Sequence, residues 1–169
     1  HKVFQKIQFG GRPVVSALQG AVVGGGLELA TSTHVRVADK SAFFQLPEGQ
    51  RGIFVGGGAS VRVGKIIGPD RMTEMMLTGR RYSAEDGYRL GLSHYLVEEG
   101  KALEEAMKLA AQIATNAPLS NWASITAVAN IGDMSMANGL YTESLAAAIA
   151  QSSDEANRRM QDFLNRKKG

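Results

Sequence analysis

Two glutamates and a run of three glycines have the residue types and the spacing for proton transfer beside a stabilised anion. Glu28 follows Gly24-Gly25-Gly26, and Glu48 follows Pro47 further along the chain. A carboxyl group can donate or accept a proton during a reaction, and a peptide N–H at a helix N-terminus can stabilise an oxyanion. The combination indicates proton addition or removal at a carbon next to a carbonyl group, or delivery of water to an activated alkene.

The residues around the glycines predict a strand, a glycine turn and a helix. Val14–Leu18 is a short apolar run after Pro13, which is typical of a buried strand, and Leu27–Ala30 consists of good helix formers. The first N–H groups of a helix have no intrahelical partner, and glycine lets a ligand approach the backbone. Gly24-Gly25-Gly26 is therefore a candidate oxyanion hole. A glycine turn that serves only close packing is the structural alternative.

Each glutamate also has a structural alternative. Glu28 is predicted to lie in the first turn of the helix, where the helix dipole favours a carboxylate whatever its function. Glu48 comes after the aromatic strand 42–45, where a solvated loop residue would be unremarkable. The residues alone leave both alternatives open.

The remaining pattern predicts a half made of strands and turns followed by a helical half. We expect neighbouring strands at 34–38 and 42–45, a second glycine-to-helix junction at 55–58, and a strand at 95–97 after a helix that begins near Ser83. Helical spacing and breaks at Pro118 and Gly132 predict helices over these ranges: 101–115, 120–131, 138–150 and 153–166.

Composition excludes several classes of protein. The chain of 169 residues has a formal net charge of +3 and no cysteine, which excludes a disulfide framework and a thiol nucleophile. Its longest apolar stretches, such as Val14–Leu18 and Leu145–Ile149, are too short to span a membrane, and no signal peptide is visible at His1. We expect a cytoplasmic protein with no metal site, and a start at His1 that results from truncation.

Three motifs together resemble the crotonase (enoyl-CoA hydratase/isomerase) superfamily. Residues 21–30, AVVGGGLELA, are similar to the segment around the first catalytic glutamate of enoyl-CoA hydratases, and LPEGQRG at 46–52 is similar to the segment around the second. The stretch 64–97 resembles the family's segment of helix, LTG turn, helix and strand. The resemblance covers nearly the whole chain.

The resemblance implies an α/β fold in which a crotonase-like ββα spiral precedes C-terminal oligomerisation helices. Residues 1–98 would form the C-terminal part of the spiral core, and 99–169 a helical oligomerisation region that builds a trimer or a dimer of trimers. Gly25 would donate its N–H to the thioester oxygen, with Gly24 and Gly26 beside the substrate. Glu28 and Glu48 would share the holding of water and the movement of protons to and from Cα.

The resemblance also assigns coenzyme A contacts and exposes departures from the family pattern. Phe163 and Lys167 would lie near the adenine and phosphates of CoA, which enters as part of the substrate, with no separate cofactor. A solvated basic helix end is the alternative for this segment. The family's N-terminal part, with a second oxyanion donor, is missing, and residues 49–51 and 54–58 depart from the pattern beside the acyl pocket. His34 stands where the family often has Asp, and we expect it to be structural.

The resulting functional hypothesis is hydration of a 2-enoyl-CoA by a homo-oligomeric enzyme. Other crotonase chemistry remains as an alternative, namely hydratase-lyase, double-bond isomerase or thioester hydrolase activity. From a different class, a non-catalytic CoA- or RNA-binding protein is a further alternative. No interleaving of aromatic and basic residues favours nucleic acid as a partner, and the expected partner is an acyl-CoA thioester.

Overall fold

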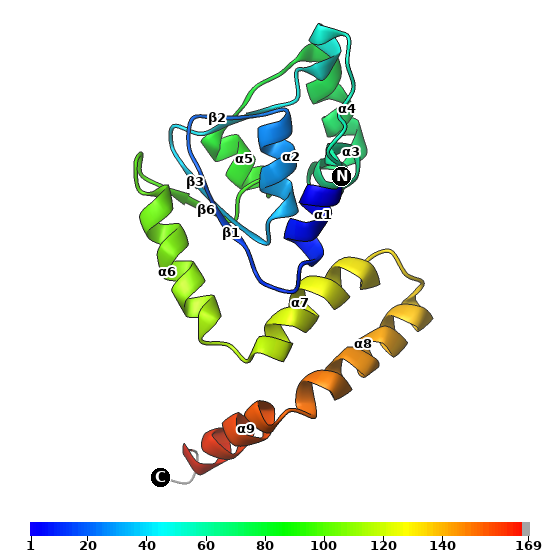
Figure 1. Ribbon diagram of the computed structural model, residues 1–169. Helices are drawn as coiled ribbons and strands as arrows, with labels where there is room; N and C mark the ends of the chain where they lie inside the picture. The colour runs from blue at the N-terminus through cyan, green and yellow to red at the C-terminus, as the bar shows by residue number, and fades with distance from the viewer. Residues whose placement is uncertain (167–169) are drawn as a thin grey trace. The chain divides into compact units, whose positions relative to one another are not determined.

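A computed structural model describes residues 1–166 (Figure 1). These residues divide into two units. The first unit holds residues 1–10 and 14–111, and the second holds 11–13 and the residues from 112 onward. Over residues 1–166, every helix falls short of the length or the apolar character that a bilayer-spanning segment needs.

Within the described residues of the first unit, the strands form two three-stranded sheets. In one sheet, β1 (Val15–Leu18) and β6 (Tyr95–Val97) flank β3 (Val35–Asp39), and both pairings are parallel. In the other, β2 (Ala21–Val23) pairs in parallel with β4 (Phe43–Gln45), and β4 pairs antiparallel with β5 (Tyr82–Ser83). The first four strands therefore alternate between the two sheets, whereas β4 and β5 belong to the same sheet.

The expected pairing of strands 34–38 and 42–45 is wrong, because β3 and β4 belong to different sheets. Asp39 ends β3, and its carboxylate accepts hydrogen bonds from both the N–H and the hydroxyl of Ser41. Ser41 Oγ in turn accepts from the Gly20 N–H at 3.0 Å, at the turn between β1 and β2. These hydrogen bonds join the turn between β1 and β2 to the turn between β3 and β4. At each turn the chain passes from one sheet to the other.

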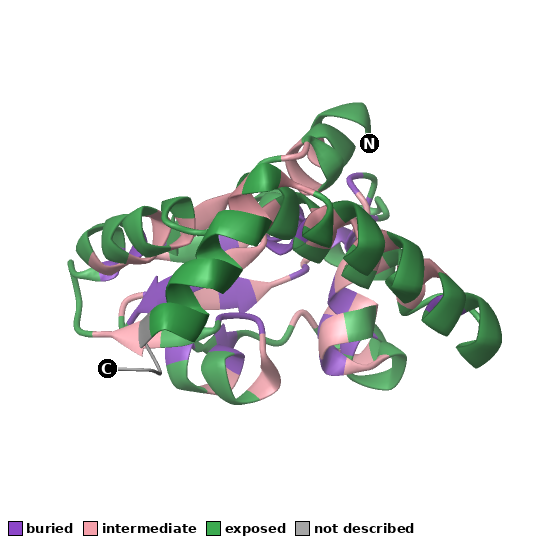
Figure 2. Cartoon of the chain, turned by 90° about the horizontal axis from the view of Figure 1, so that it is seen from below, coloured by how far each residue is buried: buried purple, intermediate pink, exposed green. Residues whose placement is uncertain are grey.

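Helices cover the sheets of the first unit and enclose its main core. They are α1 (Lys2–Phe9), α2 (Gly25–Ser32), η1 (Glu48–Arg51, a 3-10 helix), α3 (Ala59–Ile67), α4 (Pro69–Thr78), α5 (Ala84–Leu90) and α6 (Ala102–Ala114). Leu27, Phe44 and Met75 are fully buried at the centre of the core. Figure 2 shows this burial concentrated on the strands and on the helix faces turned toward them.

A smaller apolar cluster fixes the first part of α6 to the β1-β3-β6 sheet. Ala102 and Ala106 pack with Val37 of β3, and Leu109 packs against the edge of the same cluster. Alanines let the helix approach the sheet closely, so α6 belongs to the first unit as far as Ala111.

The second unit contains the C-terminal helices: α7 (Pro118–Ile131), α8 (Met136–Gln151) and α9 (Asp154–Arg166). Together with α6, they confirm the expected C-terminal helical region, and each begins and ends within four residues of its expected bounds. Ser135 caps α8 by accepting from the Asn138 N–H. Arg159 of α9 donates to the Thr115 carbonyl at 2.8 Å, which ties the ends of this unit together.

Arg36 is the most heavily bonded buried cation of the first unit. Its guanidinium donates to the carbonyls of Thr33, Gly91 and Leu92 at 3.0, 3.2 and 2.7 Å. Burial lowers the pKa of Arg36 to about 10, so the side chain still carries a positive charge at neutral pH. The side chain joins the end of α2 to the turn after α5, where backbone carbonyls lack helical partners.

We expect Arg36→Met to lower the free energy of unfolding by about 3 kcal/mol, because three backbone carbonyls lose a charged donor. Arg89→Met is the matched control, since the Arg89 side chain is 72% exposed and pairs with Asp86 on the surface. Urea unfolding of both variants measures the difference. Equal midpoints for the two variants would contradict the role given to Arg36.

His94 lies against Arg36, and its contacts predict that folding depends on pH. Its Nδ1 accepts from the Arg36 backbone N–H at 3.0 Å, and its Nε2 lies 3.2 Å from the Arg36 guanidinium. Burial first, and then the Arg36 charge, lower the pKa of His94 below the ordinary value of 6.5.

Between the lowered pKa of His94 and 6.5, the unfolded chain binds more protons than the folded chain, so stability rises with pH. We therefore expect the unfolding midpoint to fall as the pH is lowered from 6.5, and to level off below the folded pKa of His94. His94→Asn keeps an acceptor near the Arg36 N–H but cannot titrate, so it should flatten this part of the profile. An unchanged slope in this variant would assign the acid sensitivity to other groups.

Candidate active site

The N-terminus of α2 presents peptide N–H groups at a glycine turn. Gly24 has φ of 54°, a value that favours glycine, and its N–H donates to the Gln45 carbonyl at 3.0 Å. Gly25 begins the helix and Gly26 follows, and both are exposed. N–H groups in this first turn have no partner within the helix. The structure thus places Gly25 where a ligand oxygen can accept its N–H.

The Glu28 carboxyl group is buried and accepts hydrogen bonds from a helix other than its own. Only 6% of Glu28 is exposed, and its Oε1 accepts from the N–H groups of Gly57 and Ala59 at 2.6 and 3.2 Å. These two donors lie at the N-terminus of α3, which has no side-chain cap at Gly58. The carboxyl therefore joins α2 to α3, a role that goes beyond a favourable position in the dipole of α2.

Glu48 is also buried, so the alternative of a solvated loop residue is wrong. It is the first residue of η1 and is 8% exposed. Among residues 1–166, no donor reaches its Oε2. A buried carboxyl oxygen without a protein partner is costly unless a water or a ligand satisfies it.

Parallel pairing brings Glu48 to the glycine turn. Val23 and Gln45 are partners at the ends of β2 and β4, so the segments that follow both strands emerge side by side. A Cβ atom on Gly24 would lie 2.8 Å from Glu48 Oε1, and the Gly24 carbonyl accepts from the Glu28 N–H at 3.0 Å. Both glutamates and the glycine turn therefore meet in one part of the first unit.

Several neighbours of Glu28 were not predicted from the sequence. A Cβ atom on buried Gly57 would lie 2.6 Å from Glu28 Oε2 and would also overlap the Phe4 ring of α1. Arg62 donates to the Gly57 carbonyl at 2.9 Å. The glycine-to-helix junction at 55–58 was the available signal, because a helix start without a capping side chain needs an acceptor from elsewhere.

An apolar cavity of about 350 Å³ begins beside η1. It is open to solvent and has no carboxylate in its wall, which consists of Gly49, Ile53, Phe54, Ser60, Pro69, Met72, Thr73, Met76 and Leu77. Its wall includes Gly49, the residue that follows Glu48 in the chain, but neither glutamate.

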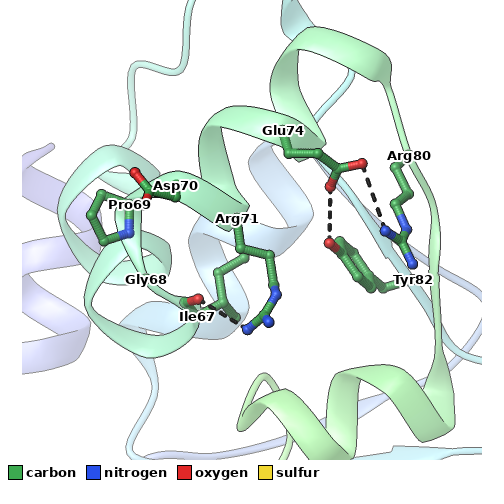
Figure 3. Close-up of a pocket in the computed structure, with 8 residues that line it drawn as sticks. All are labelled: Ile67, Gly68, Pro69, Asp70, Arg71, Glu74, Arg80 and Tyr82. Atoms are coloured by element: carbon green, nitrogen blue, oxygen red, sulfur yellow. Dashed lines mark hydrogen bonds and ion pairs between the residues drawn. The ribbon is translucent and has the colours of Figure 1, made fainter.

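A second cavity, of about 500 Å³, contains charged groups that already bind one another (Figure 3). Tyr82 and Arg80 both point toward Glu74: the Tyr82 hydroxyl donates a hydrogen bond at 3.0 Å, and Arg80 forms an ion pair at 3.7 Å. Burial, and then the bond to Glu74, raise the pKa of Tyr82, which keeps the hydroxyl protonated. Its lining residues include neither Glu28 nor Glu48, nor any residue of the glycine turn.

The predicted CoA contacts at the C-terminus stay predictions. Phe163 lies in α9 and is 53% exposed, but α9 belongs to the second unit. Lys167 lies outside the described residues. Residues 1–166 contain no group of three or more His, Asp or Glu side chains that could hold a metal ion.

The whole sequence matches a known protein family. Residues 1–169 match the profile described as enoyl-CoA hydratase/isomerase. Carnitinyl-CoA dehydratase from Salmonella typhi is 38% identical over 109 residues, which is 64% of this chain and 42% of that protein.

Solved structures of similar fold cover nearly all of the chain. A protein from Rhodopseudomonas palustris CGA009, described as a candidate enoyl-CoA hydratase, is 52% identical with a TM-score of 0.96, covering 99% of this chain and 65% of its own. Enoyl-CoA hydratase from Bacillus anthracis is 28% identical with a TM-score of 0.92, covering 98% and 64%. This chain thus spans about two fifths of its curated relatives and two thirds of these solved chains. The expected crotonase-like fold is confirmed.

We expect Gly57→Ala to displace the Glu28 carboxyl, because the added Cβ would lie 2.6 Å from Glu28 Oε2. Overpacking of this kind costs about 1–3 kcal/mol of stability. Gly56→Ala is the control for stability, since a Cβ on exposed Gly56 would meet no atom within 4 Å. Thermal unfolding of both variants tests the contact, and equal stability of the two would show that Gly57 is not tightly enclosed.

Proposed function

The chain belongs to the enoyl-CoA hydratase/isomerase family of the crotonase superfamily, and we propose that it carries the acid/base site of an acyl-CoA enzyme that hydrates 2-enoyl-CoA. In this proposal Glu28 and Glu48 are the catalytic carboxyl groups, and Gly25 binds the thioester oxygen. Gly24 and Gly26 lie beside the bound thioester.

The observation that carries the proposal is the meeting of two buried carboxyl groups with exposed helix N–H groups. Glu28 accepts two peptide N–H bonds, whereas Glu48 Oε2 accepts none from residues 1–166. The two carboxyls thus have different surroundings, which is what a pair with separate acid and base roles requires. A structural pair of carboxyls would have no need of an unpartnered buried oxygen.

The proposed reaction adds water across the double bond next to the thioester. One glutamate, as carboxylate, removes a proton from water while the water oxygen bonds to Cβ. The electron pair of the double bond moves toward the thioester, and the resulting negative charge on its oxygen is stabilised by the Gly25 N–H. The other glutamate, as carboxylic acid, gives its proton to Cα. We assign removal of the water proton to Glu28, whose Oε1 is held by two N–H donors, and donation of the proton to Glu48.

The apolar cavity beside η1 supports an apolar acyl chain as substrate. Its wall includes Phe54, Met72 and Met76, and it offers no carboxylate to pair with a cationic acyl group. The likeness to carnitinyl-CoA dehydratase supports a second candidate, removal of water from a 3-hydroxyacyl-CoA. The same two carboxyl groups would serve both directions, because a catalyst of one direction also catalyses the reverse.

We also propose a homo-oligomer, a trimer or a dimer of trimers, built through the second unit. Its helices expose large apolar side chains that a lone subunit would leave in water, among them Val128, Met136, Leu140 and Tyr141. The cytoplasmic location predicted from the sequence, and the CoA contacts of Phe163 and Lys167, stay predictions.

In the intact protein that contains this chain, we expect Glu28→Gln and Glu48→Gln each to lower the hydration rate of crotonyl-CoA by about 10²-fold or more. Each change removes a proton donor or acceptor but keeps the side-chain size. Loss of the enoyl thioester absorbance measures the rate, and an aromatic enoyl-CoA is assayed in parallel. Glu98→Gln is the control, because that side chain is 75% exposed and pairs with Lys40 on the surface.

Failure of the wild-type protein to hydrate either substrate, with CoA still bound, would overturn the hydratase proposal and favour isomerase, hydrolase or binding roles. Activity that survives both glutamine substitutions would remove Glu28 and Glu48 from the mechanism.

A further inference from the structure

The Glu28 carboxyl is held by backbone groups whose own position depends on Arg62. The Gly57 N–H donates to Glu28 at 2.6 Å, and the Gly57 carbonyl accepts from Arg62 Nη1 at 2.9 Å. One residue thus links the guanidinium to the carboxyl. Gly57 cannot be replaced as a link by a larger residue, because its Cβ position is occupied by Glu28 and Phe4.

Arg62 is itself fixed from α1. Its Nε donates to Gln8 Oε1 at 2.7 Å, and the Gln8 carbonyl accepts from His34 Nε2 at 2.9 Å. His34 Nδ1 accepts from the Val14 N–H at 3.0 Å, which leaves Nε2 to donate to the Gln8 carbonyl. His34 therefore has the structural role expected from the sequence. It holds Gln8, which in turn holds the Arg62 guanidinium.

The backbone at the start of α3 is shaped around the guanidinium. Gly58 has φ of 105°, and a Cβ atom there would overlap Arg62 Nη1. Arg62 also lies close enough to Glu28 for their charges to interact, since burial lowers the pKa of Arg62 while Glu28 raises it. The guanidinium is thus both a hydrogen-bond anchor and the nearby positive charge for the buried carboxyl.

We propose that Arg62, fixed by Gln8 of α1, is a positioning residue that holds the Glu28 carboxyl in its reactive geometry through Gly57. The proposal rests on the proposed function, in which Glu28 transfers a proton. Arg62 touches no reacting atom in this scheme. It acts by setting the place of the Gly57 N–H and by placing a positive charge near the carboxyl.

A purely structural Arg62 and a positioning Arg62 predict different kinetics. Loss of a structural contact lowers stability and the fraction of folded enzyme, without changing how the folded enzyme depends on pH. A displaced acid/base carboxyl lowers kcat, leaves KM nearly unchanged, and alters the pH–rate profile. Active-site titration therefore has to accompany the rate measurement.

The test compares Arg62→Met, Arg62→Lys and Gln8→Leu in the intact protein, with crotonyl-CoA as substrate. We expect Arg62→Met to lower kcat about tenfold or more, with KM changed less than about threefold. It should also alter the pH–rate profile. Arg62→Lys keeps the charge but not the fork of donors, so it should restore the pH profile and not kcat. Gln8→Leu should lower kcat in the same direction by less.

Arg89→Met serves as the control for loss of an exposed arginine, and Glu28→Gln reports separately on the proposed function. An unchanged kcat and pH profile in folded Arg62→Met, with Glu28→Gln inactive, would overturn the positioning role alone. If Arg62→Met does not fold, Gln8→Leu decides, and wild-type kinetics in that variant would overturn the proposal. Wild-type activity in Glu28→Gln would instead overturn the proposed function.

Discussion

The pair of hydrogen bonds from the start of α3 to the Glu28 carboxyl is the interaction on which the site depends. A carboxyl group buried to 6% exposure needs donors, and the N-terminus of a helix needs an acceptor. Gly57 and Ala59 satisfy both requirements at once. Because Glu28 lies on α2, this exchange fixes α2 against α3, and any change that separates the two helices also leaves a buried carboxyl without partners.

The parallel pairing of β2 with β4 determines which other groups meet this carboxyl. The carboxyl ends of β2 and β4 are adjacent. The glycine turn after β2 and Glu48 after β4 therefore lie close together although they are separated in sequence. Glycine is required where backbone passes a carboxyl oxygen, as at Gly24 and Gly57. The site therefore combines tight backbone packing with two polar side chains, of which one is satisfied by protein donors and the other is not.

Much of the architecture follows from local sequence. Helix formers and breaks predicted the bounds of the four C-terminal helices closely. A helix was also expected to begin near Ser83, and Ser83 caps α5 by accepting from the Asp86 N–H. The pairing of strands at 34–38 and 42–45 was wrong because period-two alternation identifies a strand but not its neighbour. Helix α1 and the short strand β2 were not assigned, since α1 buries no residue fully and β2 has three residues.

The sequence by itself identified the two glutamates and the glycine turn as candidate site residues, and it indicated the family. Residue types at fixed spacing can be recognised along the chain without a structure. Only the tertiary structure decided how the glutamates differ. Glu28 is held by donors from a helix about thirty residues away, and Glu48 is left with an unpartnered oxygen. The link from α1 through Arg62 to Gly57 could not be predicted from the sequence either. Hydrogen bonds between distant segments depend on packing and leave no periodic pattern in the sequence.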